Sequence, residues 1–227
     1  MKRLGTVMLC ILVTVCALWG RQINPGKERW VVKTSVKAGV AKTGTIAYAA
    51  FAPLPDANGV KHNDSRFDDK LIPASMTPDQ PAEGTIVTVT GFLRLVALED
   101  DGDYHIQLTA TPTDTDCIIV EVPKDDPEFV KNAALRDKAA AVRVFVRKNL
   151  LHKEDQEPSQ RGNLMTHPPF VRVTGQLFFD DAHVGDPKRG KQNMKASTLW
   201  EIHPVTAMAF APVPGGGKKI AALTPTN

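Results

Sequence analysis

Two short segments of the chain place a carboxylate and a histidine two residues apart. Asp103 and His105 stand in DYHIQL, and Glu201 and His203 stand in WEIHPV. Imidazole and carboxylate groups are ligands of divalent transition metals, and they also serve as general acids and bases at phosphate and glycosidic bonds. The two pairs, with His183 upstream of the second, raise the question of whether these segments meet in one site.

Both segments alternate in the manner of half-buried β-strands, so polar and apolar side chains fall on opposite faces. Tyr104, Ile106 and Leu108 share the apolar face of the first segment, and Trp200 and Ile202 share that of the second. We expect these apolar faces to line the interior. The histidines and carboxylates should then lie outside or at a rim.

Three interpretations of these polar residues stay open. In the first, some of them bind a divalent metal ion or a polar ligand, and in the second they act in acid–base catalysis. In the third, they only stabilise the fold, because an aspartate at a hairpin accepts hydrogen bonds from turn amides and a histidine donates a ring N–H to a carboxylate. The candidate metal ligands are Asp103, His105, His183, Glu201 and His203.

The elements that must position these residues are strands. Five β-branched or alternating segments span 85–98, 103–111, 116–122, 170–179 and 198–210. Asp126 and Pro127 are typical of a helix start, which predicts a helix from about Pro127 through the 140s.

Three strands, a helix and two strands follow the order of an oligonucleotide/oligosaccharide-binding (OB) barrel. We therefore predict a mainly β domain over residues 85–211, a five-stranded OB-like barrel (β-β-β-α-β-β). In that barrel we expect the fifth strand to close against the first. The second and fifth strands, which carry the two histidine segments, then need not be neighbours.

The flanking segments differ in composition from this domain. Residues 1–20 join Lys2 and Arg3 to an apolar run too short for a membrane span, which is typical of a secretory signal peptide. We predict export, to the periplasm or as a secreted protein, with no membrane span after cleavage. Residues 21–84 are predicted to form a loop-rich, extended N-terminal arm packing on the core, with 28–36 extended, and residues 212–227 a disordered tail.

Composition limits the chemistry. Only Cys117 of the three cysteines lies outside the signal, so the mature chain has no internal disulfide and depends on its core. Removal of residues 1–20 takes two of the 28 basic residues and none of the 25 acidic ones, which leaves a net charge of +1 and no global field for nucleic acid. The absence of G-x-S-x-G, P-loop, dinucleotide and CxxC motifs leaves nucleophilic, nucleotide and thiol chemistry without support.

Several strings resemble an uncharacterised family of exported bacterial proteins. They are ERW-VKT, an SR…P stretch with Arg66 and Pro73, GDYHIQL, CIIVEVP, VTGQLFFDDAH and WEIHPV, over roughly residues 28–210. The family carries the pattern DGDYHL…EIP…VTGVGFFDF-HGQ…ELHPV. The resemblance implies export and an OB-like fold, and it implies no activity. Where family members have a short HGQ-G-AP-NG loop, this chain has the longer, basic HVGDPKRGKQNMKAST.

These observations predict an exported, non-enzymatic OB-like module that binds a small ligand or a protein through loops and one outer face, without a required cofactor. One alternative is a nuclease-like hydrolase that needs a divalent metal at the histidine and carboxylate residues. The other is binding of an anionic polymer, nucleic acid or glycan, through the basic loop 185–197. The candidate ligand contacts are Asp103, His105, Glu201, His203, Lys188, Arg189 and Lys191.

Overall fold

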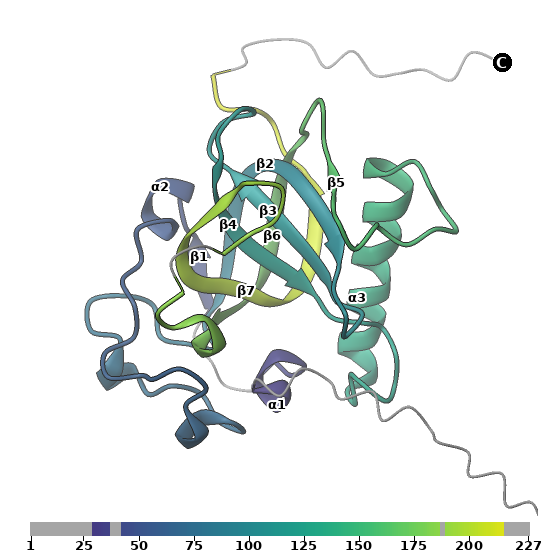
Figure 1. Cartoon of the computed structure of the whole chain (residues 1–227). Helices are drawn as coiled ribbons and strands as arrows, with labels where there is room; N and C mark the ends of the chain where they lie inside the picture. Colours follow the sequence, from purple (N-terminus) through teal and green to yellow (C-terminus); the bar gives the residue numbers. More distant parts are fainter. Residues whose placement is uncertain (1–28, 37–41, 187–188, 216–227) are drawn as a thin grey trace, which may run out of the picture.

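Seven strands join in one sheet, so the structure is mainly β as the sequence predicts (Figure 1). The computed structural model describes residues 29–36, 42–186 and 189–215. The predicted signal, residues 1–20, and most of the predicted tail lie outside the described residues. No helix in the described ranges is long and apolar enough to cross a membrane.

Five long strands make up most of the sheet, and they agree with the predicted segments to within three residues at each end. They are β2 (Ile86–Leu98), β3 (Tyr104–Thr109), β4 (Asp116–Val122), β6 (Phe170–Phe179) and β7 (Lys195–Phe210). Two short strands, β1 (Lys42–Thr45) and β5 (Asn163–Leu164), pair with β2. Neither short strand is predicted from the sequence, because both lie in polar, turn-rich stretches.

The pairing of the five long strands closes on itself. It runs β2–β3–β4–β7–β6 and returns from β6 to β2, with β4 and β7 parallel and the other neighbours antiparallel. The expectation that the fifth strand closes against the first is therefore wrong. The strand that pairs with β2 and closes the order is β6. β7 pairs with β6 on one edge and with β4 on the other, so it lies between them. Only β4 then separates the two histidine segments.

One face of each strand lines a common apolar interior. Tyr104, Ile106 and Leu108 of β3 are fully buried in the main hydrophobic cluster, together with Trp200 and Ile202 of β7. The apolar half of the alternation prediction is confirmed.

The helix after β4 begins later than predicted. α3 spans Ala133–Phe145 and continues as a π turn over Val146–Leu150. The Asp126 carboxylate accepts a hydrogen bond from the backbone N–H two residues on (2.8 Å), but it caps only an isolated turn. The Asn132 side chain accepts one from the N–H three residues on (3.0 Å) and begins the helix. The predicted start at Pro127 is wrong, because the turn capped by Asp126 does not continue as a helix, whereas the turn capped by Asn132 does.

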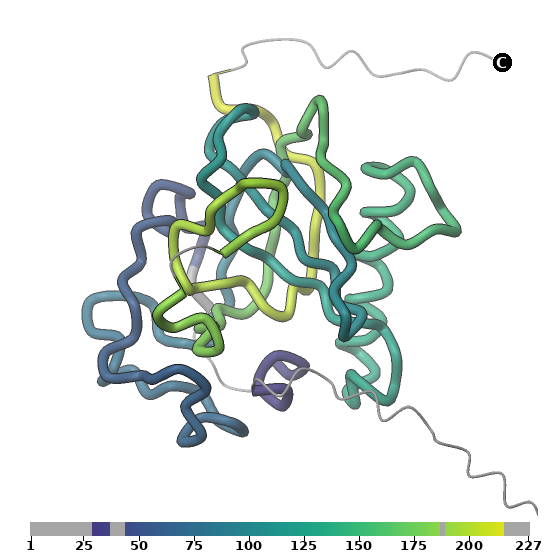
Figure 2. The backbone as a smooth tube through the Cα atoms, in the orientation of Figure 1, coloured from purple at the N-terminus to yellow at the C-terminus, as the bar shows by residue number. Residues whose placement is uncertain are grey.

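The N-terminal arm is built of short elements. Figure 2 shows that residues 42–84 and α3 lie on opposite sides of the sheet. The predicted extended segment 28–36 is wrong where α1 forms, because the chain turns through Arg29 in the left-handed region (φ 49°) and two N–H groups then donate to Arg29 O. The arm's helices are α1 (Trp30–Lys33), α2 (Tyr48–Phe51) and 3-10 turns at Ser65–Phe67 and Ala74–Met76.

A buried ion pair fixes the start of the arm to the sheet. The Arg29 guanidinium binds both carboxylate oxygens of Glu83 at 2.6 Å and donates to Phe179 O at the end of β6 (2.9 Å). Glu83 in turn accepts from the N–H of Phe179 (2.9 Å) and of Ile72 (2.6 Å). Because both charges are fully hydrogen-bonded, the pair can persist away from water.

Candidate functional site

The two histidine segments meet at Glu121 of β4. Glu121 is the cross-strand partner of His105, and β7 runs along the other edge of β4. His105 Nδ1 lies 2.9 Å from Glu121 Oε1, and His203 Nδ1 lies 3.1 Å from Glu121 Oε2. One carboxylate therefore receives both imidazoles, one on each oxygen.

Each histidine has a second carboxylate neighbour. His203 Nε2 lies 3.3 Å from Asp103 Oδ2, directly before β3, and His105 Nδ1 lies 3.4 Å from Glu99 Oε1, directly after β2. The five side chains form a row in which carboxylates and imidazoles alternate. We call Asp103, His203, Glu121, His105 and Glu99 the His–carboxylate cluster.

Four of the five side chains of this cluster, all except Glu99, are buried, which corrects the prediction that the histidines and carboxylates of the two segments lie outside or at a rim. Asp103 and His203 have no exposed surface, and His105 and Glu121 expose 6% and 9%. Glu201, predicted to be exposed with them, retains 3%. These side chains lie on the strand faces opposite the apolar interior, as alternation requires, but other segments of the chain cover those faces.

The first covering segment is α1. Val32 O accepts a hydrogen bond from Gln176 Nε2 of β6 (3.4 Å), which places α1 over the outer side of that strand. Lys33 Nζ lies 5.8 Å from the centre of the Phe178 ring, and the same ring meets the His203 ring edge-on at 5.8 Å. A helix of the arm therefore separates the buried end of the cluster from solvent.

The second covering segment is the loop between β6 and β7, which crosses in front of the strands in Figure 1. Gln107 of β3 holds it, because its amide oxygen accepts from Lys191 N (2.5 Å) and its amide nitrogen donates to Lys191 O (3.3 Å). That orientation turns the oxygen toward His105 Nε2 at 3.1 Å, so Nε2 carries a proton. The other ring nitrogen, Nδ1, faces the carboxylates of Glu99 and Glu121.

Charge rather than burial decides the ionisation of His203. Burial lowers the pKa of His203, but the ion pairs with Asp103 and Glu121 outweigh it and raise that pKa to about 9. Burial likewise raises the pKa of Glu121, while contacts with His105 and His203 hold it well below the ordinary value. At neutral pH His203 is therefore an imidazolium between two carboxylates.

The adjacent hairpin supports Asp103 in the way that the structural interpretation predicts. Asp101 Oδ1 accepts from Asp103 N (3.0 Å), and Asp103 Oδ1 accepts from Lys124 N (2.8 Å). Burial and the neighbouring charge of Asp103 raise the pKa of Asp101 to about 6. One oxygen of Asp103 is thus used by the turn, and Oδ2 is turned toward the cluster.

Three buried atoms of the cluster lack a well-directed hydrogen bond: Asp103 Oδ2, His203 Nδ1 and His203 Nε2. Opposite charges lie 3.1–3.3 Å away, but their directions do not fit hydrogen-bond geometry. Nitrogen and oxygen atoms about 3 Å apart also match two ligands on one metal ion with bonds of ~2.0–2.2 Å. Two sets of three donor groups lie within 4.8 Å of one another: Asp103, Glu121 and His203, and Glu99, His105 and Glu121.

The remaining predicted ligands lie at the margin of the cluster or apart from it. Glu201 Oε2 is 4.0 Å from His203 Nδ1, but its other oxygen forms an ion pair with Arg189. His183 is 44% exposed at the side chain and binds Asp186 through Nδ1 (2.6 Å). The structure thus unites Asp103, His105 and His203, places Glu201 beside them, and leaves His183 outside.

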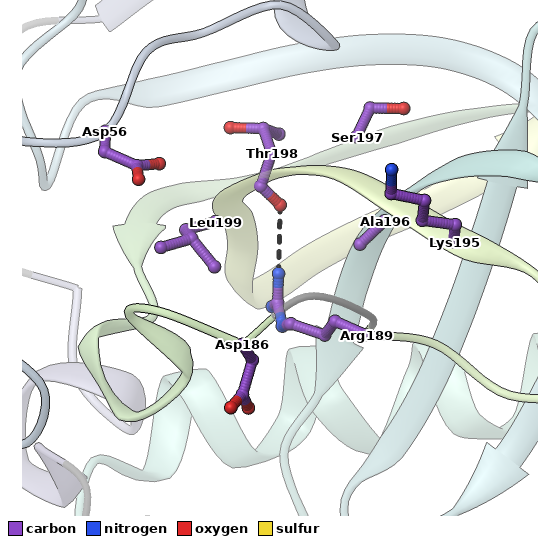
Figure 3. Close-up of a pocket in the computed structure, with 8 residues that line it drawn as sticks. All are labelled: Asp56, Asp186, Arg189, Lys195, Ala196, Ser197, Thr198 and Leu199. Carbon is purple, nitrogen blue, oxygen red and sulfur yellow. Dashed lines mark hydrogen bonds between the residues drawn. The ribbon is translucent and has the colours of Figure 1, made fainter.

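Arg189, predicted to bind an anionic ligand, is buried and already paired. It donates to Thr198 O (3.0 Å), as Figure 3 shows, and its guanidinium lies 2.9 Å from Asp180 Oδ2. The pocket beside it, of about 160 Å³, is also lined by Asp56 and Asp186. The positive charge of Arg189 is therefore offset by carboxylates of the same chain.

The other cations of the basic loop offer little more. Lys191 Nζ lies 3.2 Å from Glu99 Oε2, so this half-buried ammonium forms an ion pair with a carboxylate of the cluster. Lys188 lies outside the described residues. Of the cations in the described part of the loop, Arg189 and Lys191 are therefore paired with carboxylates of the same chain, and Lys195 is exposed.

Sequence reasoning missed Glu121, which holds the site together. A signal was present, because Glu121 is the one carboxylate among the apolar residues of CIIVEV, and a charge in a buried strand needs a partner. Glu99 is likewise not among the residues predicted for the site. Recognising either as a partner requires the strand order, in which β4 lies between the two histidine strands.

Comparison with known proteins gives no family for this chain. No protein-family model matches it, and no curated protein matches it. The resemblance to exported bacterial proteins stays a prediction, and the functional argument rests on the geometry of the His–carboxylate cluster.

Proposed function

We propose that this chain is an exported, non-enzymatic, OB-like module that binds a divalent transition-metal ion at its His–carboxylate cluster. The observation that carries the proposal is the convergence of two imidazoles and three carboxylates, from segments a hundred residues apart, around Glu121. Nitrogen and carboxylate oxygen donors of this kind suit Zn²⁺ and its first-row neighbours.

The OB-like part of the proposal is supported by the strand pairings. In an OB barrel five strands close into a ring, with a helix between the third and fourth. Here the five long strands pair in a closed order and α3 lies between β4 and β6. The cluster belongs to the outer side of β3 and β4, the second and third strands of that ring, which is the face that OB folds use for ligands.

The metal-binding part is supported by the buried atoms without directed hydrogen bonds. A buried polar atom that lacks a partner costs free energy, so its retention needs a compensating interaction. A cation bound to Asp103 Oδ2 and one nitrogen of His203 would supply it. The donor groups are also held in place, because Asp103 Oδ1 accepts a hydrogen bond from Lys124 N and the Gln107 amide oxygen faces His105 Nε2.

The non-enzymatic part is supported by the cover over the cluster. Asp103 and His203 have no exposed surface, and pockets of about 160, 340 and 580 Å³ are lined by other residues. A hydrolase needs an open position for its substrate, which the covered donors do not offer. Polymer binding is disfavoured by the pairing of Arg189 and Lys191 with carboxylates.

Metal binding is tested by thermal unfolding of chelator-treated protein that carries no histidine tag. A ligand that binds only the folded state raises Tm, so Zn²⁺ or Mn²⁺ should raise that of the wild type. His203→Gln should abolish the rise, whereas His183→Gln, which changes a half-exposed histidine outside the cluster, should retain it. An unchanged wild-type Tm, with no stoichiometric metal in protein purified without chelator, would overturn the proposal.

A further inference from the structure

We infer that the cluster is a two-ion centre in which Glu121 bridges two divalent transition-metal ions, one held with His105 and Glu99 and the other with His203 and Asp103. This inference rests on the proposed function and adds the number of ions and the division of ligands.

The first support is the way in which Glu121 presents its two oxygens. Oε1 faces His105 Nδ1 at 2.9 Å, and Oε2 faces His203 Nδ1 at 3.1 Å. A carboxylate that offers one oxygen to each of two ligand sets can hold two ions at the ~3.5–4 Å separation of two-metal sites. A single ion at one histidine would leave the other oxygen of Glu121 and the other imidazole without a metal role.

The second support is that each half of the cluster offers the same three kinds of donor. Both carboxylates face Nδ1 of His105 in one half, whereas in the other Glu121 faces Nδ1 and Asp103 faces Nε2 of His203. Glu99, His105 and Glu121 form one set of three donors within 4.8 Å, and Asp103, Glu121 and His203 form the other. Each half therefore has one imidazole, one terminal carboxylate and one oxygen of the shared Glu121. Such a set supplies three of the four ligands of a tetrahedral ion.

The third support is the difference in environment between the halves. Asp103 and His203 are fully buried, whereas the Glu99 side chain is 31% exposed and its second oxygen pairs with Lys191 Nζ at 3.2 Å. Lys191 is itself 3.3 Å from Gln160 O, so its ammonium has an acceptor outside the cluster. The rim half is the entry side, and the buried half is the one shielded by α1.

The charge of the cluster is compatible with two ions. Once the imidazoles are neutral, Glu99, Asp101, Asp103 and Glu121 supply four negative charges, of which Lys191 offsets one, so the cluster balances most of the charge of two divalent cations. Asp101 contributes negative charge without binding an ion, because its carboxylate accepts a hydrogen bond from the N–H of Asp103 (3.0 Å). Lys33 and Lys191 approach from the covering segments, and Glu201 is paired with Arg189.

The test is native mass spectrometry of the full chain, chelator-treated, tag-free and titrated with Zn²⁺. The wild type should bind two ions. Glu99→Gln should bind one, because it removes a ligand of the rim half only, and Asp103→Asn should bind one through the other half. Glu121→Gln should bind none. Far-ultraviolet circular dichroism of each variant establishes that it is folded, and Glu154→Gln, an exposed carboxylate, is the matched control and should bind two.

The outcomes separate the two proposals. One ion in the wild type would overturn the two-ion centre and leave the proposed metal-binding function standing, whereas no ion would overturn both. Two ions that persist in folded Glu121→Gln would overturn the bridging role. Two ions that become one in His183→Gln would place the second ion at His183 and Asp186, and the inference would fail.

Discussion

At the scale of the residue, His203 holds a positive charge where water does not reach. Its imidazole faces carboxylates from three strands, Asp103 before β3, Glu121 in β4 and Glu201 in β7, and the Phe178 ring of β6. Burial alone would lower the pKa of His203, and the nearest carboxylates raise it to about 9. A metal ion bound at His203 under the proposed function would have to displace this proton.

The stability of the metal-free protein should fall as pH rises from about 6.5 to about 9. The folded state keeps the His203 proton up to a pKa of about 9, whereas the unfolded chain releases it near 6.5. The stabilisation by this proton is therefore complete below pH 6.5 and is lost as the pH rises to about 9. The loss should be about 3 kcal/mol in the free energy of unfolding, measured by urea titration with chelator present.

Asp101 and Glu121 do not produce this slope, because both titrate below this window. Burial raises the pKa of Asp101 only to about 6, and that of Glu121 is lowered. His203→Gln should flatten the profile across the window. A wild-type free energy that stays constant there would contradict the assignment of the charge to His203.

At the scale of the element, a bulge in β7 positions His203. β6 pairs Gly175 with Val205 and Leu177 with Ile202, so β7 contains one residue more than β6 between the two pairs. A Cβ on Gly175 would lie 2.4 Å from Pro204 O and 2.5 Å from Ile202 Cγ2. The close approach of the two backbones, which requires glycine, places the bulge next to His203.

Gly175→Ala should therefore destabilise the protein by about 2 kcal/mol or more, because backbone atoms must move to admit the methyl group. Gly44→Ala in β1 is the control, since nothing lies within 4 Å of its Cβ position, and it should change stability by no more than about 0.5 kcal/mol. Urea unfolding of both variants checks the difference. Equal stabilities would mean that β6 and β7 do not approach so closely.

The cover over the cluster should depend on the buried pair of Arg29 and Glu83. Arg29→Met leaves the Glu83 carboxylate buried without its cation, which should cost about 3–5 kcal/mol. Arg66→Met is the matched control, because Arg66 pairs with Asp64 while its side chain is 50% exposed, and it should cost less than about 1 kcal/mol. If the two variants unfold at the same urea concentration, the pair does not fix the arm.

The strands could be predicted from the sequence because their signal is local. Alternation in DYHIQL and FVRVTGQLFF assigns faces residue by residue, and the structure follows it in β3 and β6. α1 could not be predicted in this way, since the left-handed turn at Arg29 is held by Glu83, which lies 54 residues away. The start of α3 was missed because Asp126 and Asn132 both cap turns, and only packing decides which turn continues.

At the scale of the whole molecule, the order of the strands creates the site. His105 and His203 meet because β6 and not β7 closes against β2, which leaves β7 beside β4. The sequence identified both histidines and Asp103 as candidates. It could not identify Glu121 as their common partner or the burial of the group, because both follow from strand order and from segments that fold over the outer face.

Metal binding around Glu121 can be observed by anomalous diffraction at the zinc edge, from crystals of chelator-treated protein grown with Zn²⁺. We expect peaks at ~2.0–2.2 Å from Glu121 Oε1 and Oε2, each also bound to His105 or His203. A map without peaks there, with the His203 imidazolium still between the carboxylates of Asp103 and Glu121, would contradict metal binding by the cluster.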